Sequence, residues 1–286
     1  MTAIVVTAAA AAAIAVLAAC PPARRTVPVS VSPPSAAPHG EEMPPSAPPP
    51  TSPPVQPDTF GKLAVIIDDA GYSLTELEPF LHLPGPLAIA VLPNLPHSTE
   101  AAQRVLAAGK DLILHCPMEP EGSEDPGPGA IRTGMSAAEV EELLDRDFAS
   151  VPGAAGMNNH MGSRATADPE LMAIVLDYLK RHGKFFVDSR TTADTAGPRI
   201  ALRLGIPILQ RNVFIDDERT NEEIDRFFEA GVEEARTRGS AVIIGHVQTP
   251  AVVDILRARL EGLSGQEVRL ARLQEIMKEQ AAAYSP

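Results

Sequence analysis

The chain has 286 residues, a formal net charge of −13 at pH 7 and a pI near 5.0. This acidic balance, without a window of clustered Lys and Arg, argues against a partner with a phosphate backbone, so we expect no binding to nucleic acid. The length allows one large domain or two small ones.

The first twenty residues, "MTAIVVTAAAAAAIAVLAAC", form an uncharged apolar run. A run of this length is typical of a secretion signal peptide or a membrane anchor. Its end, "LAAC", resembles the lipobox of bacterial lipoproteins, in which Cys20 would carry the lipid. No Lys or Arg precedes the run, whereas Arg24 and Arg25 follow it. Residues 1–20 are therefore expected to be a signal peptide or an anchor that is cleaved, lipidated or retained.

Residues 21–59 contain 14 of the 29 prolines, with Ser, Ala and Thr between them. Such a segment buries too little apolar surface to order itself, so we expect a Pro-rich, disordered linker. An apolar terminus followed by a spacer predicts an exported protein of the periplasm or cell envelope. Membrane contact is expected only through the N-terminal segment, and the sequence does not fix the oligomeric state.

The two cysteines, Cys20 and Cys116, are too few for a disulfide scaffold. If His115 faces a functional site, strand alternation points its neighbour Cys116 the other way. We therefore expect Cys116 to be neither catalytic nor disulfide-bonded.

From Phe60 onward, short apolar runs alternate with amphipathic stretches. The runs cover 63–67, 86–92, 111–114, 154–157, 184–187, 206–215, 241–244 and 266–270. Strands that are apolar on both faces and alternate with helices predict a parallel sheet covered by helices. Seven or eight such units favour an irregular (β/α) barrel of seven or eight strands over an open doubly wound sheet, which stays the alternative. We place this domain at residues 60–280.

Several helix starts are explicit in the sequence, and two of them follow a long loop or a predicted strand end. Ser136 with Glu139 forms the pattern of a capping box, and Asp168 followed by Pro169 is typical of an N-cap before a first helical proline. Both predict where a helix begins after a long loop or a strand end.

Polar residues able to bind metal or move protons follow run after run. They are Asp68 and Asp69, His115 and Glu119, Asn158, Asn159 and His160, Asp188 and Arg190, Asp216 and Asp217, and His246. In a parallel barrel these strand ends lie on one face, and that face carries the chemistry. The clustering indicates function more strongly than any single motif does.

Each of these residues also has a structural explanation. A strand-end His is more often a loop or core residue than a ligand, and a strand-end Asp often caps the next helix, which fits Asp188 and Asp216. Asp68 and Asp69 are different, because two carboxylates desolvated together need compensation. A divalent cation supplies it, and two imidazoles with one carboxylate around an open position form a catalytic zinc site.

The motifs "IIDDAG", "LHCPME", "NNHMGS", "FVDSRT" and "GHVQT", in this order, resemble the divergent polysaccharide deacetylase family of bacterial envelope proteins. The resemblance covers roughly residues 62–275. The family is related to metal-dependent carbohydrate esterases that adopt a distorted (β/α) barrel. The resemblance implies Asp68 as catalytic base and His246 as catalytic acid. It implies Asp69, His115 and His160 as ligands of a divalent metal, with zinc the expected ion.

Three features depart from the patterns of those families and of carbohydrate-binding sites. The larger esterase group takes two ligand histidines from one short motif, which is absent here, so the histidines must converge from separate strands. Val247 stands after "GH", where the divergent family usually has Pro. The chain also has no Trp and 4% aromatic residues, with only Tyr72 placed to offer a ring to a sugar. A short or polar substrate, or a loosely held polymer, fits this composition best.

The expected function is a metal-dependent hydrolase that removes an acetyl or other acyl group from an amino sugar of an envelope carbohydrate. Glu119, Asn159, Asp188 and Arg190 are expected to orient the substrate or to support the ligands. A non-catalytic envelope protein that keeps the fold and binds glycan or a partner remains the alternative.

Phosphoryl transfer fits less well, although it also uses Asp pairs at strand ends. A receiver domain would need an Asp at the end of the third strand, where this chain has His115. An aspartate-based phosphatase would need an Asp two residues after its nucleophile, where Ala70 follows Asp68.

Overall fold

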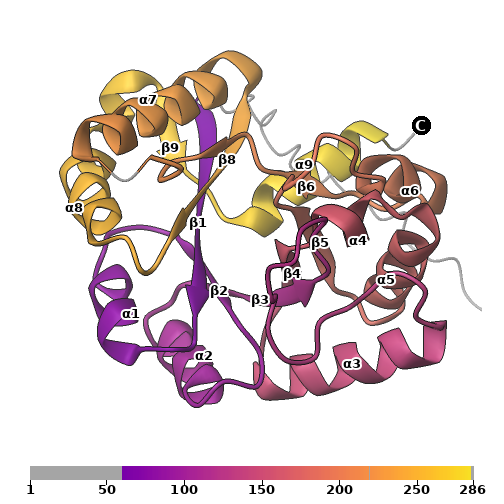
Figure 1. Cartoon of the computed structure of the whole chain (residues 1–286). Coiled ribbons are helices and arrows are strands. Elements are labelled where there is room, and N and C mark those ends of the chain that lie inside the picture. Colours follow the sequence, from indigo (N-terminus) through magenta and orange to yellow (C-terminus); the bar gives the residue numbers. More distant parts are fainter. Residues whose placement is uncertain (1–59, 219, 285–286) are drawn as a thin grey trace, which may run out of the picture. The chain divides into compact units, whose positions relative to one another are not determined.

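The computed structural model describes residues 60–218 and 220–284, whose arrangement is shown in Figure 1. The expectations for residues 1–20 and 21–59 concern segments outside this described part. Among the described residues, no helix combines the length and the apolar character needed to cross a membrane.

Nine strands of the described residues form one sheet, and neighbouring strands pair in parallel. They are β1 (Gly61–Ala70), β2 (Ala88–Val91), β3 (Asp111–Met118), β4 (Gly156–Met161), β5 (Phe185–Asp188), β6 (Leu209–Gln210), β7 (Val213–Phe214), β8 (Ser240–His246) and β9 (Val268–Leu270).

The strand order is β6-β5-β4-β3-β2-β1-β8-β7, and β9 pairs with the start of β1. The sheet curls with helices around it, as Figure 1 shows, and this confirms the predicted irregular (β/α) barrel over the open doubly wound sheet.

The prediction of one strand over 206–215 is wrong. The run is divided at the polar residues Arg211 and Asn212, and its two halves lie at opposite ends of the strand order as β6 and β7. Arg211 N donates to Asp188 O of β5 at 2.9 Å, and Asn212 N donates to Val242 O of β8 at 2.8 Å. This segment therefore spans the opening between the two edges of the curled sheet.

The helices are α1 (Leu74–Leu81), α2 (Ser98–Ala107), α3 (Ala137–Ser150), α4 (Ser163–Ala167), α5 (Pro169–Arg181), α6 (Gly197–Leu204), α7 (Asn221–Arg238), α8 (Pro250–Arg259), the 3₁₀ helix η1 (Leu260–Gln266) and α9 (Leu273–Tyr284). The two predicted starts are confirmed. Ser136 and Glu139 form a capping box at α3, and the Asp168 side chain caps α5, whose first residue is Pro169.

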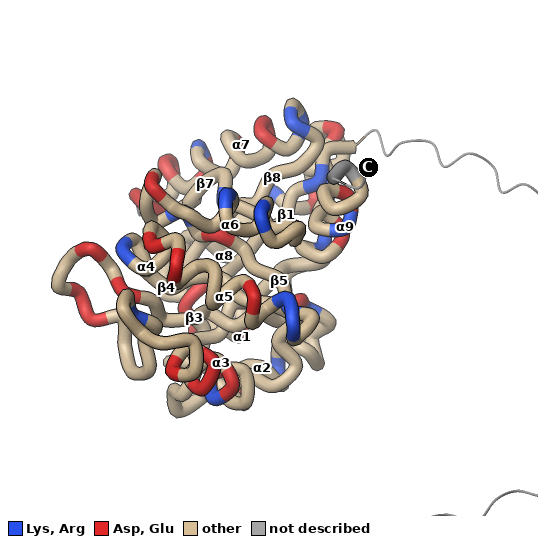
Figure 2. Tube along the Cα trace, turned by 90° about the vertical axis from the view of Figure 1, so that its right-hand side faces the viewer, with Lys and Arg blue, Asp and Glu red and all other residues tan. Residues whose placement is uncertain are grey.

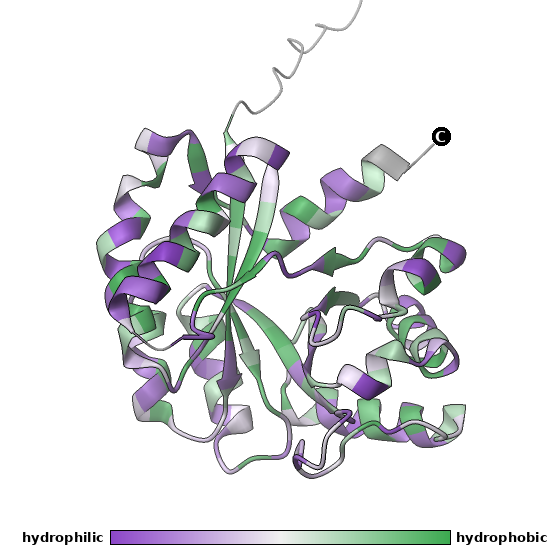
Figure 3. Cartoon of the chain, turned by 45° about the horizontal axis from the view of Figure 1, so that its top comes forward, coloured by the Kyte–Doolittle hydropathy of each residue, from purple (hydrophilic) through white to green (hydrophobic). Residues whose placement is uncertain are grey.

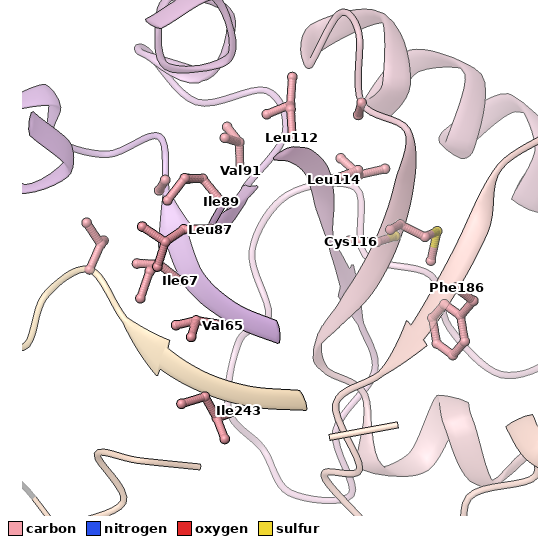
Figure 4. Close-up of a cluster of buried hydrophobic side chains, with 14 of the residues drawn as sticks. Val65, Ile67, Leu87, Ile89, Val91, Leu112, Leu114, Cys116, Phe186 and Ile243 are labelled. Atoms are coloured by element: carbon pink, nitrogen blue, oxygen red, sulfur yellow. The ribbon is translucent and has the colours of Figure 1, made fainter. Parts of the chain in front are cut away.

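The outer face of the sheet packs against the helices. Figure 4 shows this layer, in which Val65, Ile67, Leu114 and other buried side chains lie together. Figure 3 shows apolar strands beside helices that are apolar along one stripe only, as expected for a covered sheet. Cys116 is a free, fully buried cysteine in this layer, so the prediction that it points away from the inner face is confirmed.

The inner face of the sheet forms a second, smaller apolar cluster. Its strand residues include Ala64, Ile66, Ala88, Ala90, Ile113, Val187, Val242 and Ile244, and α9 adds Leu273, Ile276 and Met277. Three small alanines leave room for the side chains of α9 inside the curl. The polar side chains of the candidate site lie at the carboxyl ends of the same strands, two positions after Ile66, Ile113 and Ile244.

Candidate metal centre

Strand alternation directs five polar side chains to the inner face of the sheet. Asp68, His115 and His246 follow the inner residues Ile66, Ile113 and Ile244 at a spacing of two. Parallel register pairs Asp68 with His246, and His115 with Asn158, and His160 lies two residues beyond Asn158 on β4. The apolar inner cluster thus supports a polar layer at the carboxyl ends of the strands.

Asp69 joins this layer through an unusual backbone conformation. Alternation alone would point Asp69 away from Asp68, but its φ is +65° and the register of β1 with β2 shifts between Ile67 and Ala70. A non-glycine residue in this region costs on the order of 1–3 kcal/mol, and bulges of this kind re-aim side chains beside functional sites. The local distortion brings both carboxylates of the pair toward the same place.

Three ligand-type atoms form a nearly equilateral triangle. Asp69 Oδ1 lies 3.1 Å from His115 Nε2 and 3.0 Å from His160 Nδ1, and the two nitrogens are 3.1 Å apart. A tetrahedral zinc ion with bonds of about 2.0–2.2 Å places its ligand atoms roughly 3.3–3.6 Å apart. The edges of the triangle are a few tenths of an ångström shorter, so a small outward shift of the three side chains would fit them to one such ion.

The polar atoms of this triangle favour a cation. Asp69 Oδ1 is buried and has no hydrogen-bond partner among the described residues. Burial raises the pKa of Asp69, but the imidazoles of His115 and His160 outweigh it and hold this pKa below its usual range. Burial lowers the pKa of His115, whereas Asp68 and Asp69 raise it above the ordinary value. A buried carboxylate and two imidazoles whose nitrogens converge on one point are a ligand set suited to zinc.

Asp68 lies behind the triangle and is almost completely buried, with 1% of its surface exposed. Its Oδ1 accepts a hydrogen bond of 2.8 Å from Asn158 Nδ2, and its Oδ2 is 3.7 Å from His115 Nε2. Burial raises the pKa of Asp68, which His115 and His246 partly oppose. A carboxylate of raised pKa beside a metal position has the properties of a general base.

The buried carboxylate of Asp216 holds His246 in place. Asp216 Oδ1 accepts from His246 Nδ1 at 2.9 Å, and Asp216 Oδ2 accepts from the backbone N of His246 at 3.0 Å. Burial lowers the pKa of His246, but the bond to Asp216 and the charge of Asp68 raise it to about 9. The imidazole is consequently protonated at neutral pH and can give a proton from Nε2.

Two of the expected residues, Glu119 and Asp188, bind loops instead of entering the triangle. Glu119 Oε2 accepts from Thr133 N and Oγ1 at 2.8 and 2.7 Å, which fixes the loop between β3 and α3. Asp188 is fully buried and accepts from Arg190 N at 2.8 Å and from Thr195 Oγ1 at 2.7 Å. Both carboxylates therefore fix loops and do not contact the triangle.

Asn159 and Arg190 belong to the same loop layer. Asn159 Oδ1 accepts from Ser189 N at 2.9 Å, and its Nδ2 donates to Met161 O at 2.7 Å. Arg190 is exposed with a φ of +50°, and its carbonyl accepts from Arg211 Nη2 at 2.9 Å. The loop after β5 is thus fixed by hydrogen bonds, while the guanidinium of Arg190 stands at its surface.

Three residues to which the sequence assigns no role in the site make contacts there, namely Asn158 and Asp216, which follow predicted strands, and Ser189. Asn158 touches both Asp68 and His115, and Ser189 Oγ accepts from Asn158 Nδ2 at 3.3 Å. Alternation on β4 could have found Asn158, because it shares a face with His160. Asp216 had an equally good explanation as a helix cap, and no local pattern links it to His246, 30 residues away.

The family comparison covers most of the domain. The profile of the divergent polysaccharide deacetylase family matches residues 65–277. An uncharacterized protein of Haemophilus influenzae is 38% identical over 202 residues, which cover 71% of this chain and 72% of that protein. The uncharacterized protein YibQ of Escherichia coli is 33% identical over 219 residues, covering 77% of this chain and 68% of YibQ.

Solved structures share the fold at lower identity. An uncharacterized protein from Agrobacterium tumefaciens has a TM-score of 0.73 at 20% identity, with 78% of this chain and 92% of that chain covered. The catalytic domain of a peptidoglycan N-acetylglucosamine deacetylase from Eubacterium rectale has a TM-score of 0.51 at 14% identity, with coverage of 78% and 93%. With the family match over residues 65–277 and these shared folds, the chain belongs to the divergent polysaccharide deacetylase family.

Proposed function

We propose that this protein is a metal-dependent hydrolase that removes an acetyl group from an amino sugar of an envelope carbohydrate. The observation that carries the proposal is the triangle of Asp69 Oδ1, His115 Nε2 and His160 Nδ1, flanked by Asp68 and His246. Family membership and the deacetylase fold of the Eubacterium rectale protein support the choice of reaction.

Asp69, His115 and His160 would hold the ion, with zinc proposed from the donor set. A bound zinc ion lowers the pKa of water from 15.7 to about 7 and polarises a carbonyl group. Side chains of the protein must then take one proton from the attacking water and give one to the departing amine.

Asp68 is the proposed base, because its carboxylate lies beside the triangle and burial raises its pKa. His246 is the proposed acid, because Asp216 binds its Nδ1 and leaves Nε2 to protonate the amine as the amide C–N bond breaks. The products are acetate and a free amino sugar.

A direct test combines metal analysis with turnover. The purified protein should contain one zinc ion per chain and release acetate from N-acetylglucosamine oligomers or peptidoglycan fragments. Removing the metal with a chelator should abolish release, and adding zinc should restore it. Zinc binding without acetate release from either substrate would refute the proposed reaction and favour a binding protein that keeps the fold.

We also propose that the domain acts at the cell envelope, tethered through residues 1–59. The support is the apolar first twenty residues followed by the Pro-rich segment. Cell fractionation should find the full chain with membranes, and Cys20→Ser should release it if Cys20 carries the lipid. Membrane association that survives Cys20→Ser would indicate a retained anchor, and a protein found only in the soluble cytoplasmic fraction would contradict the proposal.

A further inference from the structure

Two adjacent asparagines on β4 make different contacts. Asn158 and Asn159 are both buried, with 0% and 1% of their surfaces exposed. Asn159 contacts loop groups, namely Ser189 N, Met161 O and Thr191 Oγ1. Asn158 instead lies on the inner face with His160 and contacts side chains of the candidate site. Asn158 and Asn159 are therefore chemically identical, neighbouring side chains with different contacts.

The contacts of Asn158 fix the orientation of its amide. Nδ2 lies 2.8 Å from Asp68 Oδ1 and 3.3 Å from Ser189 Oγ, and Oδ1 lies 2.8 Å from His115 Nδ1. The reverse orientation would set the amide oxygen against the Asp68 carboxylate. Because the oxygen faces His115, the ring must donate its Nδ1–H to it. With Nδ1–H given to Asn158, Nε2 is the nitrogen whose lone pair would bind a metal ion shared with Asp69 Oδ1, which lies 3.1 Å away.

We propose that Asn158 is a positioning residue that couples the metal ligand His115 to the base Asp68. Its oxygen holds His115 in the tautomer whose Nε2 can bind metal, and its N–H groups orient the Asp68 carboxylate. Metal-binding histidines commonly donate their other N–H to a fixed acceptor, and losing that acceptor typically costs 10–100-fold in metal affinity or activity. The Asp68 role rests on the proposed function, whereas the His115 role concerns metal binding alone.

Substitutions at position 158 separate the two roles. Asn158→Ala removes both contacts, so zinc affinity should fall about 10–100-fold, and kcat should fall as well. Asn158→Asp keeps an acceptor for His115 but sets a carboxylate against Asp68. It should retain zinc affinity within a few-fold while kcat falls at least about tenfold with little change in KM. Asn159→Ala is the matched control and should leave zinc affinity within a few-fold of the wild type.

The measurements are zinc competition against a chromogenic chelator and acetate release from N-acetylglucosamine oligomers. Wild-type zinc affinity in Asn158→Ala would overturn the role at His115, and wild-type kcat in Asn158→Asp would overturn the role at Asp68. If wild-type protein binds zinc but releases no acetate, the proposed function fails while the zinc results still decide the His115 role.

A tautomer measurement on the unaltered protein covers the case in which a variant does not fold. Long-range ¹H–¹⁵N spectra of zinc-loaded protein with labelled histidine should show His115 protonated at Nδ1 and metal-bound at Nε2. His115 bound to zinc through Nδ1 would contradict the proposal. Circular dichroism of each variant establishes which of them fold.

Discussion

At the residue scale, the two members of the Asp pair occupy different environments. Asp68 is a regular strand residue, 1% exposed and hydrogen-bonded by Asn158, whereas Asp69 is turned by its φ of +65° into the triangle. A ligand and a base respond differently to loss of charge. Substituting each residue of the pair in turn therefore tests which carboxylate is the metal ligand and which is the base.

We expect Asp69→Asn to lower zinc affinity sharply, because a neutral amide is a poorer ligand than a carboxylate. Asp68→Asn should keep zinc nearly intact while kcat falls on the order of 10²–10⁴-fold, the usual size of a general-base contribution. Zinc titration and acetate release on both variants measure the difference. Equal loss of zinc in the two variants would mean that both carboxylates are ligands and that the base lies elsewhere.

The His246 imidazole predicts an alkaline limb in the pH–rate profile. Its pKa is raised to about 9, and it must be protonated to act as an acid, so activity should fall as pH rises through that region. In Asp216→Asn the bond that raises this pKa is weakened, and the limb should move to lower pH. Asp217→Asn changes the exposed neighbour and is the control. If the alkaline limb stays at the same pH in Asp216→Asn, His246 is not the acid.

Asp147 on α3 predicts a pH dependence of stability far from the chemistry. It is fully buried, its Oδ1 accepts from Asn94 Nδ2 at 2.7 Å, and its Oδ2 has no partner among the described residues. Burial raises its pKa from 3.8 to about 6. Between these values the folded protein retains a proton that the unfolded chain loses, so this contribution to stability declines as pH rises from about 4 to 6.

Asp147→Asn should consequently be more stable than the wild type at pH 8, by at most about 3 kcal/mol, since one pKa unit corresponds to about 1.4 kcal/mol. Near pH 4 the difference should shrink. Urea unfolding at several pH values measures both, with Glu142→Gln on the exposed side of α3 as control. A variant less stable than wild type at pH 8 would show that the charged form is favourably bound.

At the element scale, α9 fills the inside of the curled sheet beneath the polar layer. Ile276 is 1% exposed and lies in the inner cluster with Ile66 and Ile244. Ile276→Ala should destabilise the protein by about 2–5 kcal/mol, the usual cost of emptying such a site. Gln274→Ala, on the exposed side of α9, should have little effect in the same denaturant titration. A loss below about 1 kcal/mol for Ile276→Ala would mean that the inner cluster does not depend on α9.

Elements with a strong local pattern could be predicted from the sequence, and those set by long-range contacts could not. Apolar runs ending in Asp68 or His246 gave the strand ends, because a covered parallel strand is apolar on both faces. The 206–215 run gave a wrong strand, because the barrel opening that divides it lies between strands distant in sequence. The sequence favoured Asn159 over Asn158, since the facing partners of each amide become visible only once the strands are paired.

At the scale of the whole molecule, the described domain coincides with the region that its relatives share. The family match covers 65–277, and the described helices and strands run from Gly61 to Tyr284. Figure 2 shows acidic positions interspersed with basic ones over the helices, with α3 strongly acidic. The fold and its candidate site are thus carried by the residues that follow the Pro-rich segment.

We therefore expect residues 1–59 to be dispensable for folding, with a sharp boundary at Phe60. Gly61 N donates to Glu267 O at 2.9 Å, and Gly61, Lys62 and Leu63 pair with β9, so the sheet begins immediately after Phe60.

A chain beginning at Phe60 should melt within about 2 °C of one beginning at Pro21. A chain beginning at Ala64 loses the β1–β9 pairing, the first part of the β1–β8 pairing and the buried Leu63. It should melt several degrees lower, since 1 kcal/mol shifts the Tm of a domain this size by about 2–4 °C. Equal melting of the Ala64 and Phe60 chains would show that this start of β1 adds no stability. A large loss in the Phe60 chain relative to the Pro21 chain would show that the Pro-rich segment packs on the domain.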